Sequence, residues 1–382
     1  MKKYFWLGCL GLLLFEIANV YFIMPMPGSQ QMNSIDAAYV LYKWRWVFRG
    51  VFVLLILAGL FKSAWKRKWI PVIPLLLLGA VIYMTNFKMA ADAMFLQPKQ
   101  LILANASDNK IDSNRLIIGI EINGEAKAYP IQLIGYHHHV QDSVGGKPVL
   151  VTYCTVCRTG RVFDPVVEGK HEQFRLVGMD HFNAMLEDET TKSWWRQVTG
   201  DAIAGKQKGK KLNELLSTQT SLATWLKLYP NTKIMQPDPA SASHYDTAFK
   251  YESGTNKSKL TGTDTASWKT KSWVVGVKTG NETKMYDWNQ LKAKRLIADN
   301  IGTTPILLVL AEDHQSFFAF ERPEYNHAFF LKGDTLVYRN HLYSINGKGI
   351  DTVSSLKRLR AYQEFFHSWK TFQPSAGMYK LK

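Results

Sequence analysis

Residues 117–164 read IIGIEINGEAKAYPIQLIGYHHHVQDSVGGKPVLVTYCTVCRTGRVFD, and residues 274–321 read VVGVKTGNETKMYDWNQLKAKRLIADNIGTTPILLVLAEDHQSFFAFE. The two segments align without a gap, and the residues they share are mostly turn formers and apolar strand positions. The shared residues of the first segment are Gly119, Glu125, Lys127, Tyr129, Asp142, Gly145, Pro148, Leu150 and Phe163. We interpret the two segments as parts of two tandem, related β-rich domains.

The reactive residues of the first segment do not recur in the second. The cysteines Cys154 and Cys157 align with Ala311 and His314, and the histidines His137, His138 and His139 align with Lys294, Arg295 and Leu296. A residue that the fold requires is expected in both copies, whereas a residue that serves chemistry is needed in only one. We therefore expect the functional site in the first copy and a chemically silent scaffold in the second.

Strand and turn signals follow one another within the first copy. Residues 117–122 and 126–129 are β-rich runs around Asn123-Gly124, a strong hairpin signal. Residues 131–140 can form a short helix, and residues 148–153 form a continuous apolar run typical of a buried strand that ends at Cys154.

These signals predict an α+β, β-rich fold in four parts. Residues 1–87 form a transmembrane region, 100–235 the first repeat with the Cys/His site, 236–272 a linker, and 273–382 a second, degenerate repeat. The linker prediction rests on composition, because residues 236–272 are rich in Ser, Thr, Asp, Lys and Gly.

The transmembrane region contains three apolar segments, residues 4–24, 46–65 and 69–87. Each comes near the roughly 20 residues that cross a bilayer as a helix. Basic residues precede the first segment and lie between the second and third, at Lys2-Lys3 and Lys66-Arg67-Lys68. If both groups are cytoplasmic, three crossings of the cytoplasmic (inner) membrane place residues 88–382 in the periplasm or at the cell exterior.

The formal net charge of +16 is partly a property of this region. Residues 1–86 hold nine Lys and Arg against two Asp and Glu, which is typical of topology signals. No basic run in the remainder is interleaved with aromatic residues, so we expect no nucleic-acid partner. The lipid bilayer is the expected partner, and any extracytoplasmic partner or substrate stays unidentified.

The pair Cys154 and Cys157 allows three interpretations. A disulfide across two intervening residues closes a very small loop and stabilises a fold by only about 2 kcal/mol, so it is a poor staple. Close spacing also favours exchange between dithiol and disulfide, with a thiolate stabilised by Arg158 or by an imidazolium. Two thiolates with a histidine form a zinc or copper site. A c-type haem is excluded because Arg158, not His, follows the second cysteine.

The three consecutive histidines cannot all face one ligand, because neighbours on a helix point about 100° apart. We select His137 as the partner of Cys154 and Cys157 in both the redox and the metal interpretation. A second polar run begins at Gly178 and contains His181 and Asn183, which we regard as pocket candidates beside Arg158.

The cysteine motif also carries a family resemblance. The run from Gly119 to Pro130, Tyr136-His137, the segment Thr152-Tyr153-Cys154-x-x-Cys157-x-Thr159-Gly160, and Ser193-x-Trp195-x-Gln197 together resemble the domain of unknown function numbered 3179. The resemblance covers the chain from about residue 100 to its end and implies no activity. His137 matches the recurrent histidine of that family, whereas Thr155 and Arg158 depart from its usual Pro and Gly.

We thus expect a membrane-anchored extracytoplasmic protein whose site serves thiol-disulfide redox chemistry or metal binding. The alternative is a non-catalytic cell-envelope binding or scaffold module with a structural disulfide.

Overall fold

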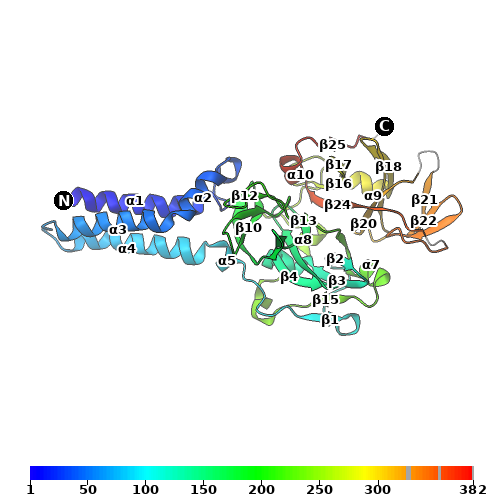
Figure 1. Cartoon of the computed structure of the whole chain (residues 1–382), viewed down its shortest axis with the longest axis horizontal. Helices are drawn as coiled ribbons and strands as arrows, with labels where there is room; N and C mark the ends of the chain where they lie inside the picture. Colours follow the sequence, from blue (N-terminus) through cyan, green and yellow to red (C-terminus); the bar gives the residue numbers. More distant parts are fainter. Residues whose placement is uncertain (324–327, 352–353, 381–382) are drawn as a thin grey trace. The chain divides into compact units, whose positions relative to one another are not determined.

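The protein is α+β and rich in β-strands, in a computed structural model that describes residues 1–323, 328–351 and 354–380 (Figure 1). The chain forms two compact units. Unit 1 comprises residues 1–96, 172–196 and 201–211, and unit 2 comprises residues 97–171, 197–200 and 212–382. The middle segment of the chain therefore belongs to the unit that contains the N-terminal helices.

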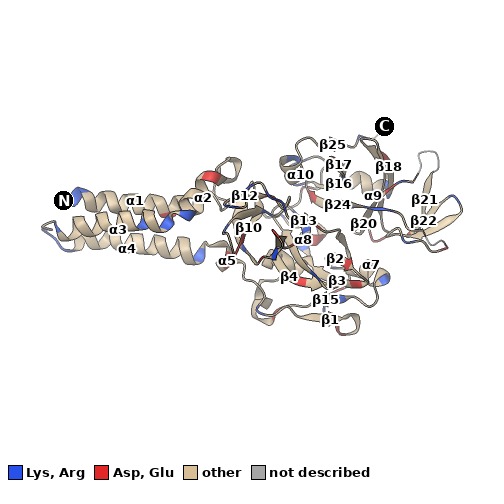
Figure 2. Cartoon of the chain, viewed as in Figure 1, with Lys and Arg blue, Asp and Glu red and all other residues tan. Residues whose placement is uncertain are grey.

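The N-terminal helices of unit 1 are apolar. They are α1 (Lys2–Tyr21), α2 (Ile35–Lys43), α3 (Arg45–Phe61) and α4 (Trp69–Tyr83), followed by the π-turn η2 (Met84–Lys88) and α5 (Ala91–Met94). Two helices are long and apolar enough to cross a membrane, or up to three if the pair α2 and α3, bent by 62°, counts as one span. Leu10, Leu54 and Leu76 are more than half exposed, as expected of lipid-facing side chains. Figure 2 shows charged residues mainly near the ends of α1, α3 and α4.

A polar cluster joins three of these helices. Arg49 donates two hydrogen bonds to the Glu16 carboxylate, at 2.6 and 2.9 Å, and a third to Asn86 Oδ1 at 2.6 Å. Asn86 Nδ2 donates to Glu16 Oε2 at 2.9 Å. Glu16 is fully buried, so this network satisfies a charge that would otherwise be costly inside the bundle.

Unit 1 also contains a four-stranded antiparallel sheet in the order β12-β11-β10-β9. Its strands are β9 (Phe174–Asp180), β10 (Asn183–Asp188), β11 (Trp194–Arg196) and β12 (Ala202–Ala204). Val177, Met185 and Trp194 of this sheet share an apolar core with Ile23 and Ala38 of the N-terminal region. The burial of this face explains why the sheet belongs to the helical unit.

Unit 2 contains two series of elements in the same order. The first is β2 (Leu116–Ile122), β3 (Glu125–Pro130), α6 (Ile131–His137), β4 (His139–Val144), β5 (Lys147–Cys154), β6 (Thr159–Asp164), β13 (Asn213–Glu214), β14 (Thr218–Ser221), α7 (Leu222–Leu228) and β15 (Lys233–Met235). The second is β16 (Trp273–Thr279), β17 (Glu282–Asp287), α9 (Trp288–Lys294), β18 (Leu296–Ile301), β19 (Thr304–Leu310), β20 (Phe317–Glu321), β24 (Arg358–Phe365), α10 (Phe366–Phe372) and β25 (Gly377–Met378).

Strand pairing is also the same in the two series. β2 pairs with β3 in antiparallel fashion and β15 adds to β3 in parallel, as β16 pairs with β17 and β25 adds to β17. The strands β4, β5 and β6 form an antiparallel meander, as do β18, β19 and β20. In the first series β4, β5, β6 and β13 form a separate sheet, whereas the second series is one seven-stranded sheet.

Close contacts recur at matching positions. A Cβ on Gly119 would lie 2.4 Å from the Trp225 ring, and one on Gly276 would lie 2.1 Å from the Trp369 ring. The residue after each first helix, His138 or Arg295, has a positive φ of 64° or 56°. These positions need a small residue or a left-handed backbone, respectively, in both series.

The two series pack on each other through β14 and β24. Gln219 Nε2 of β14 donates to Gln363 Oε1 of β24 at 3.0 Å, and these residues hold the same place in their series. β24 also contacts β6 of the first series, and β14 contacts β20 of the second. The end of each meander thus faces the last long strand of the other series.

The segment at 236–272, expected to be a linker, contains η4 (Pro239–His244) and α8 (Lys250–Ser253). Tyr245 and Tyr251 are buried in the core of the first series, and Glu252 accepts hydrogen bonds from Arg115 and from the Leu116 N–H. Composition alone did not reveal this packing, because a few aromatic and acidic side chains supply most of its contacts.

The remaining elements include a three-stranded antiparallel sheet, β21-β22-β23, and a two-stranded sheet, β7-β8. They are η1 (Ser29–Gln31), β1 (Leu103–Asn105), η3 (Ala106–Asp108), β7 (Val166–Val167), β8 (Lys170–His171), β21 (Phe329–Lys332), β22 (Thr335–Tyr338) and β23 (His341–Ser344).

Candidate thiol site

Cys154 and Cys157 lie at the tip of the hairpin formed by β5 and β6. β5 is apolar and buried on both faces, and it ends at Cys154, which pairs in register with Thr159, the first residue of β6. Both cysteines are fully buried free thiols. The position predicted for Cys154, at the end of a buried strand, agrees with this arrangement.

Gln197 links the two strands of this hairpin next to the cysteine turn. It accepts a hydrogen bond from Thr159 Oγ1 at 2.7 Å and donates to Thr152 Oγ1 and to the Thr159 carbonyl at 2.9 and 3.1 Å. All three residues are buried, so these bonds satisfy groups that have no access to water.

Residues of the second series complete the surroundings of the cysteines. The Phe365 N–H donates to the Cys157 carbonyl at 3.0 Å, and the Ser368 hydroxyl interacts with the Cys157 thiol. Cys157 also shares a hydrogen bond with Cys154, so the two sulfur atoms are neighbours. Burial raises the pKa of the Cys157 thiol well above its ordinary value, and the contact with Cys154 adds to this effect while Ser368 opposes it.

Lys271 brings a cationic group close to the turn that holds the two cysteines. Its Nζ donates to the carbonyl oxygens of Val156 and Leu260, at 2.8 and 2.6 Å, and lies 3.2 Å from His367 Nε2. Burial lowers the pKa of Lys271, whereas the charges of Cys157 and Cys154 act in the opposite direction. An ammonium group here stabilises a thiolate, and a thiolate stabilises the ammonium group.

His367 is held neutral beside Lys271. Burial, followed by the charge of Lys271, lowers its pKa to about 4. At neutral pH the imidazole therefore adds no positive charge to the site.

His137, the histidine selected from the sequence, is fully buried at the end of α6. Its Nε2 lies 2.8 Å from Tyr245 Oη, within the segment expected to be a linker. Across residues 1–323, 328–351 and 354–380, no group of three or more His, Cys, Asp or Glu side chains is placed to hold a metal ion. The zinc or copper interpretation thus gains no support from the geometry.

The neighbouring histidines have separate environments. His138 Nδ1 lies 3.1 Å from the Tyr136 carbonyl, and burial lowers the His138 pKa to about 4. His139 Nδ1 lies 3.2 Å from Gln97 Nε2.

The Arg158 guanidinium is fully buried and is bound by other parts of the chain. Its guanidinium donates to Gln363 Oε1 at 2.8 Å and to the carbonyls of Tyr251 and Glu252, and it lies 3.6 Å from the centroid of the Trp273 ring. Three directed hydrogen bonds and an aromatic face occupy this group. Lys271 is a second cationic residue near the cysteines, bound to the Val156 carbonyl between them.

The remaining candidates, His181 and Asn183, belong to unit 1, whereas the cysteines belong to unit 2. His181 Nδ1 lies 2.6 Å from Asp180 Oδ1, and Arg196 also pairs with the Asp180 carboxylate. Burial raises the pKa of Asp180, but the hydrogen bond from His181 and the charge of Arg196 outweigh it, so the pKa is lowered. Asn183 is buried and begins β10.

Sequence reasoning missed Lys271, His367 and Ser368. Lys271 lies in the segment that was expected to be a linker, and His367 and Ser368 lie in the copy that was expected to be a scaffold. One signal was present, since His367 follows the last strand of the second copy where Ala223 stands in the first.

A family model described as "Protein of unknown function (DUF3179)" matches residues 97–376, so the chain belongs to this family. Neither the curated proteins nor the solved structures gave a significant match.

Proposed function

We propose that this member of the family of unknown function DUF3179 is a membrane-anchored thiol-disulfide redox protein. The observation that supports this proposal most strongly is the hydrogen-bonded contact between the Cys154 and Cys157 thiols, with the Lys271 amine close to the turn that holds them. Two neighbouring thiols separated by two residues can form a disulfide with little movement of the chain.

The proposed reaction is exchange with a disulfide on a partner. A thiolate of the pair attacks one sulfur of that disulfide, whose S–S bond breaks, and the other sulfur leaves and takes up a proton. The second cysteine then loses its proton and attacks the mixed disulfide. The Cys154–Cys157 bond forms and the partner leaves with two thiols, so two electrons and two protons have passed to it.

Lys271 would lower the barrier to the first step. Both sulfurs are buried, so formation of a thiolate is unfavourable without a nearby positive charge. The carbonyl groups of Val156 and Leu260 hold the Lys271 amine beside the cysteine turn.

We further propose that the two series of elements are copies of one fold. Their common order, register and glycine–tryptophan contacts support this proposal. The second copy would then be a working part of the site, because it supplies His367 and Ser368 from α10, with Lys271 just before its first strand.

We also propose that the apolar helices anchor the chain in the cytoplasmic membrane with unit 2 outside the cytoplasm. The support is the basic residues at Lys2-Lys3 and Lys66-Arg67-Lys68.

The complete burial of both sulfurs favours a second candidate, a non-catalytic envelope module with a structural disulfide. The two candidates differ in how readily the pair exchanges with a small disulfide.

The test uses the full chain in detergent micelles on a Cys9→Ser background, which leaves only the pair. Free thiols are counted by maleimide gel shift before treatment, after treatment with oxidised glutathione, and again after reduction. We expect two free thiols before treatment, none after oxidation and two after reduction. Cys154→Ser and Cys157→Ser should each show no internal disulfide. A pair that stays reduced, or that cannot be reduced again without denaturant, contradicts the redox proposal.

A second arm tests Lys271. In Lys271→Met the rate of thiol alkylation at pH 7 should fall about tenfold, which corresponds to a thiol pKa raised by roughly one unit. Lys271→Arg should retain most of the rate. Lys269→Met, which removes an exposed charge two residues away, is the matched control and should have little effect.

A further inference from the structure

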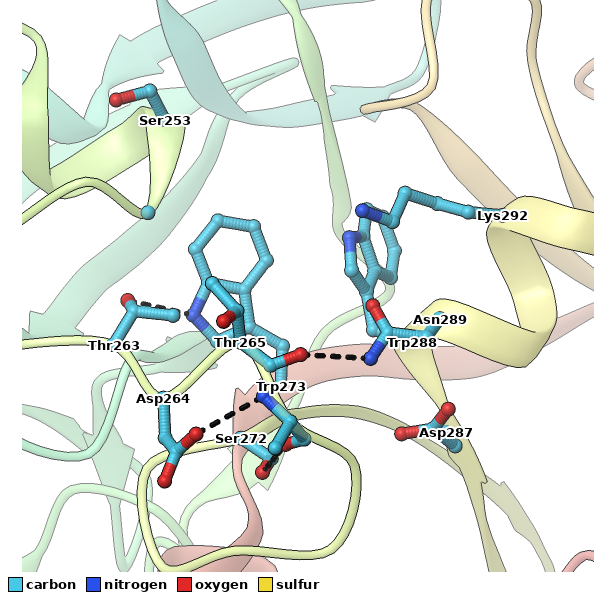
Figure 3. Close-up of a pocket in the computed structure, with 12 residues that line it drawn as sticks. Ser253, Thr263, Asp264, Thr265, Ser272, Trp273, Asp287, Trp288, Asn289 and Lys292 are labelled. Atoms are coloured by element: carbon cyan, nitrogen blue, oxygen red, sulfur yellow. Dashed lines mark hydrogen bonds between the residues drawn. The ribbon is translucent and has the colours of Figure 1, made fainter.

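A cavity in the second series lies between α9 and the loop before β16, and it is separate from the cysteines. It has a volume of about 80 Å³ and is lined by Trp273, Trp288, Asp287, Asn289 and Lys292, with loop residues that include Asp264. In Figure 3 the Trp288, Asn289 and Lys292 side chains come from α9, whereas Thr263, Asp264 and Thr265 come from the loop.

The walls of the cavity are aromatic and well supported. The Trp273 and Trp288 rings have centroids 6.0 Å apart and an interplanar angle of 59°. Trp273 Nε1 donates to Thr263 Oγ1 at 3.1 Å, and Asn289 Nδ2 donates to the Thr265 carbonyl at 2.9 Å. The loop and the helix are thus held together on either side of the opening.

Asp287 lines this cavity, and its carboxylate is only partly hydrogen-bonded within the described part of the chain. Only 1% of it is exposed, and its Oδ2 accepts hydrogen bonds from Ser267 Oγ and the Gln290 N–H. Its Oδ1 is buried without a hydrogen-bond partner in the described part of the chain. A buried carboxylate oxygen without a donor is unfavourable, so a ligand that supplies a donor and a positive charge would be stabilised there.

The residues that line this cavity differ from those at the aligned positions of the first copy. Leu116, Pro130, Ile131 and Gly135 stand in the sequence where Trp273, Asp287, Trp288 and Lys292 stand in the second. Aromatic and charged residues at four positions of one copy only are more than the shared fold requires, which points to a role in binding.

We propose that this cavity binds a small alkylammonium ion. Its N–H groups would donate to Asp287 Oδ1, and its positive charge and methylene groups would lie beside the Trp273 and Trp288 rings. Lys292 is exposed, and its flexible stem allows its amine to turn outward into solvent when the ligand enters.

The test is a titration of the full chain in micelles with n-butylammonium chloride, followed by saturation-transfer NMR at constant ionic strength. Asp287→Asn keeps the oxygen that caps α9 but removes the charge, and it should weaken binding at least about tenfold. Asp264→Asn removes an exposed charge from the same cavity and is the matched control, with a change below about threefold expected. Equal weakening by both variants would overturn the proposal, because it would indicate general attraction only.

Two further arms do not depend on Asp287→Asn folding. Thr265→Lys places a competing ammonium group on the exposed rim and should weaken n-butylammonium binding by a similar factor. Tetramethylammonium has no N–H donor and should bind at least about tenfold more weakly than n-butylammonium. The proposal is wrong if tetramethylammonium binds equally well, or if D-glucose saturates the cavity while n-butylammonium does not.

Discussion

The buried histidines make unit 2 sensitive to acid, and His138 gives the sharpest test. Its pKa of about 4 lies below the ordinary value of 6.5 because burial disfavours the charged imidazole. The unfolded chain therefore binds a proton more tightly than the folded chain between these two values. The stability that the neutral histidine contributes is fully present above about pH 6.5 and is lost as the pH falls toward 4.

The size of this effect follows from the shift. A pKa difference of about 2.5 units corresponds to about 3.4 kcal/mol in the acid limit, of which roughly 2.4 kcal/mol is lost between pH 7 and pH 4.5. The pKa of His367 is also about 4, so the contribution of this histidine to the free energy of unfolding should fall by a similar amount.

The measurement is guanidinium unfolding of the full chain in micelles at both pH values, monitored by tryptophan fluorescence. His138→Asn is the informative variant, because asparagine tolerates the positive φ of 64° at this position and does not titrate. Its free energy of unfolding should fall by roughly 2.4 kcal/mol less than that of the wild type between pH 7 and pH 4.5. His171→Asn, at an exposed position, is the control. If His138→Asn and the wild type lose equal stability, His138 is not held neutral and the reasoning fails.

Three other predictions follow from the packing, and a fourth follows from the basic residues of the N-terminal region. Gly276→Ala should destabilise unit 2 by about 1–3 kcal/mol or more in a chemical unfolding experiment, because the new Cβ would lie 2.1 Å from Trp369, whereas Gly50→Ala has open space and should not. Gln197→Leu should cost about 1–3 kcal/mol in the same assay, since it leaves the buried Thr152 and Thr159 groups unpaired. Glu16→Gln should lower the melting temperature of the full chain in micelles, because the Arg49 charge loses its partner, whereas Asp36→Asn breaks only an exposed pair and should change it little. Reporter fusions after Phe87 should be active with a periplasmic reporter and silent with a cytoplasmic one; the reverse pattern refutes the proposed orientation.

Local signals in the sequence predicted much of the first series. The Asn123-Gly124 hairpin, the helix after Pro130 and the buried strand that ends at Cys154 all occur where periodicity and turn residues placed them. These elements depend on neighbouring residues, which a single sequence displays directly.

The surroundings of the cysteines could not be predicted in this way. Lys271 and His367 come to the site from residues more than one hundred positions away, and only the packing of β24 and α10 against the first series places them there. The same limit applies to His137, since its partner Tyr245 comes from a segment whose composition resembles a linker. Contacts of this kind depend on tertiary packing, which leaves no periodic signal in the sequence.

The equilibrium redox potential of the Cys154–Cys157 pair distinguishes an exchangeable disulfide from a structural one. The Cys9→Ser chain in micelles would be equilibrated with graded ratios of reduced to oxidised glutathione, and the disulfide fraction read by acid quench and maleimide gel shift. For a thiol-disulfide redox protein we expect a single reversible two-electron transition above about −300 mV, in the range of exchangeable pairs. A potential below about −300 mV would identify a structural disulfide. A pair that stays reduced at every ratio would show that no disulfide forms. Either result contradicts the redox proposal.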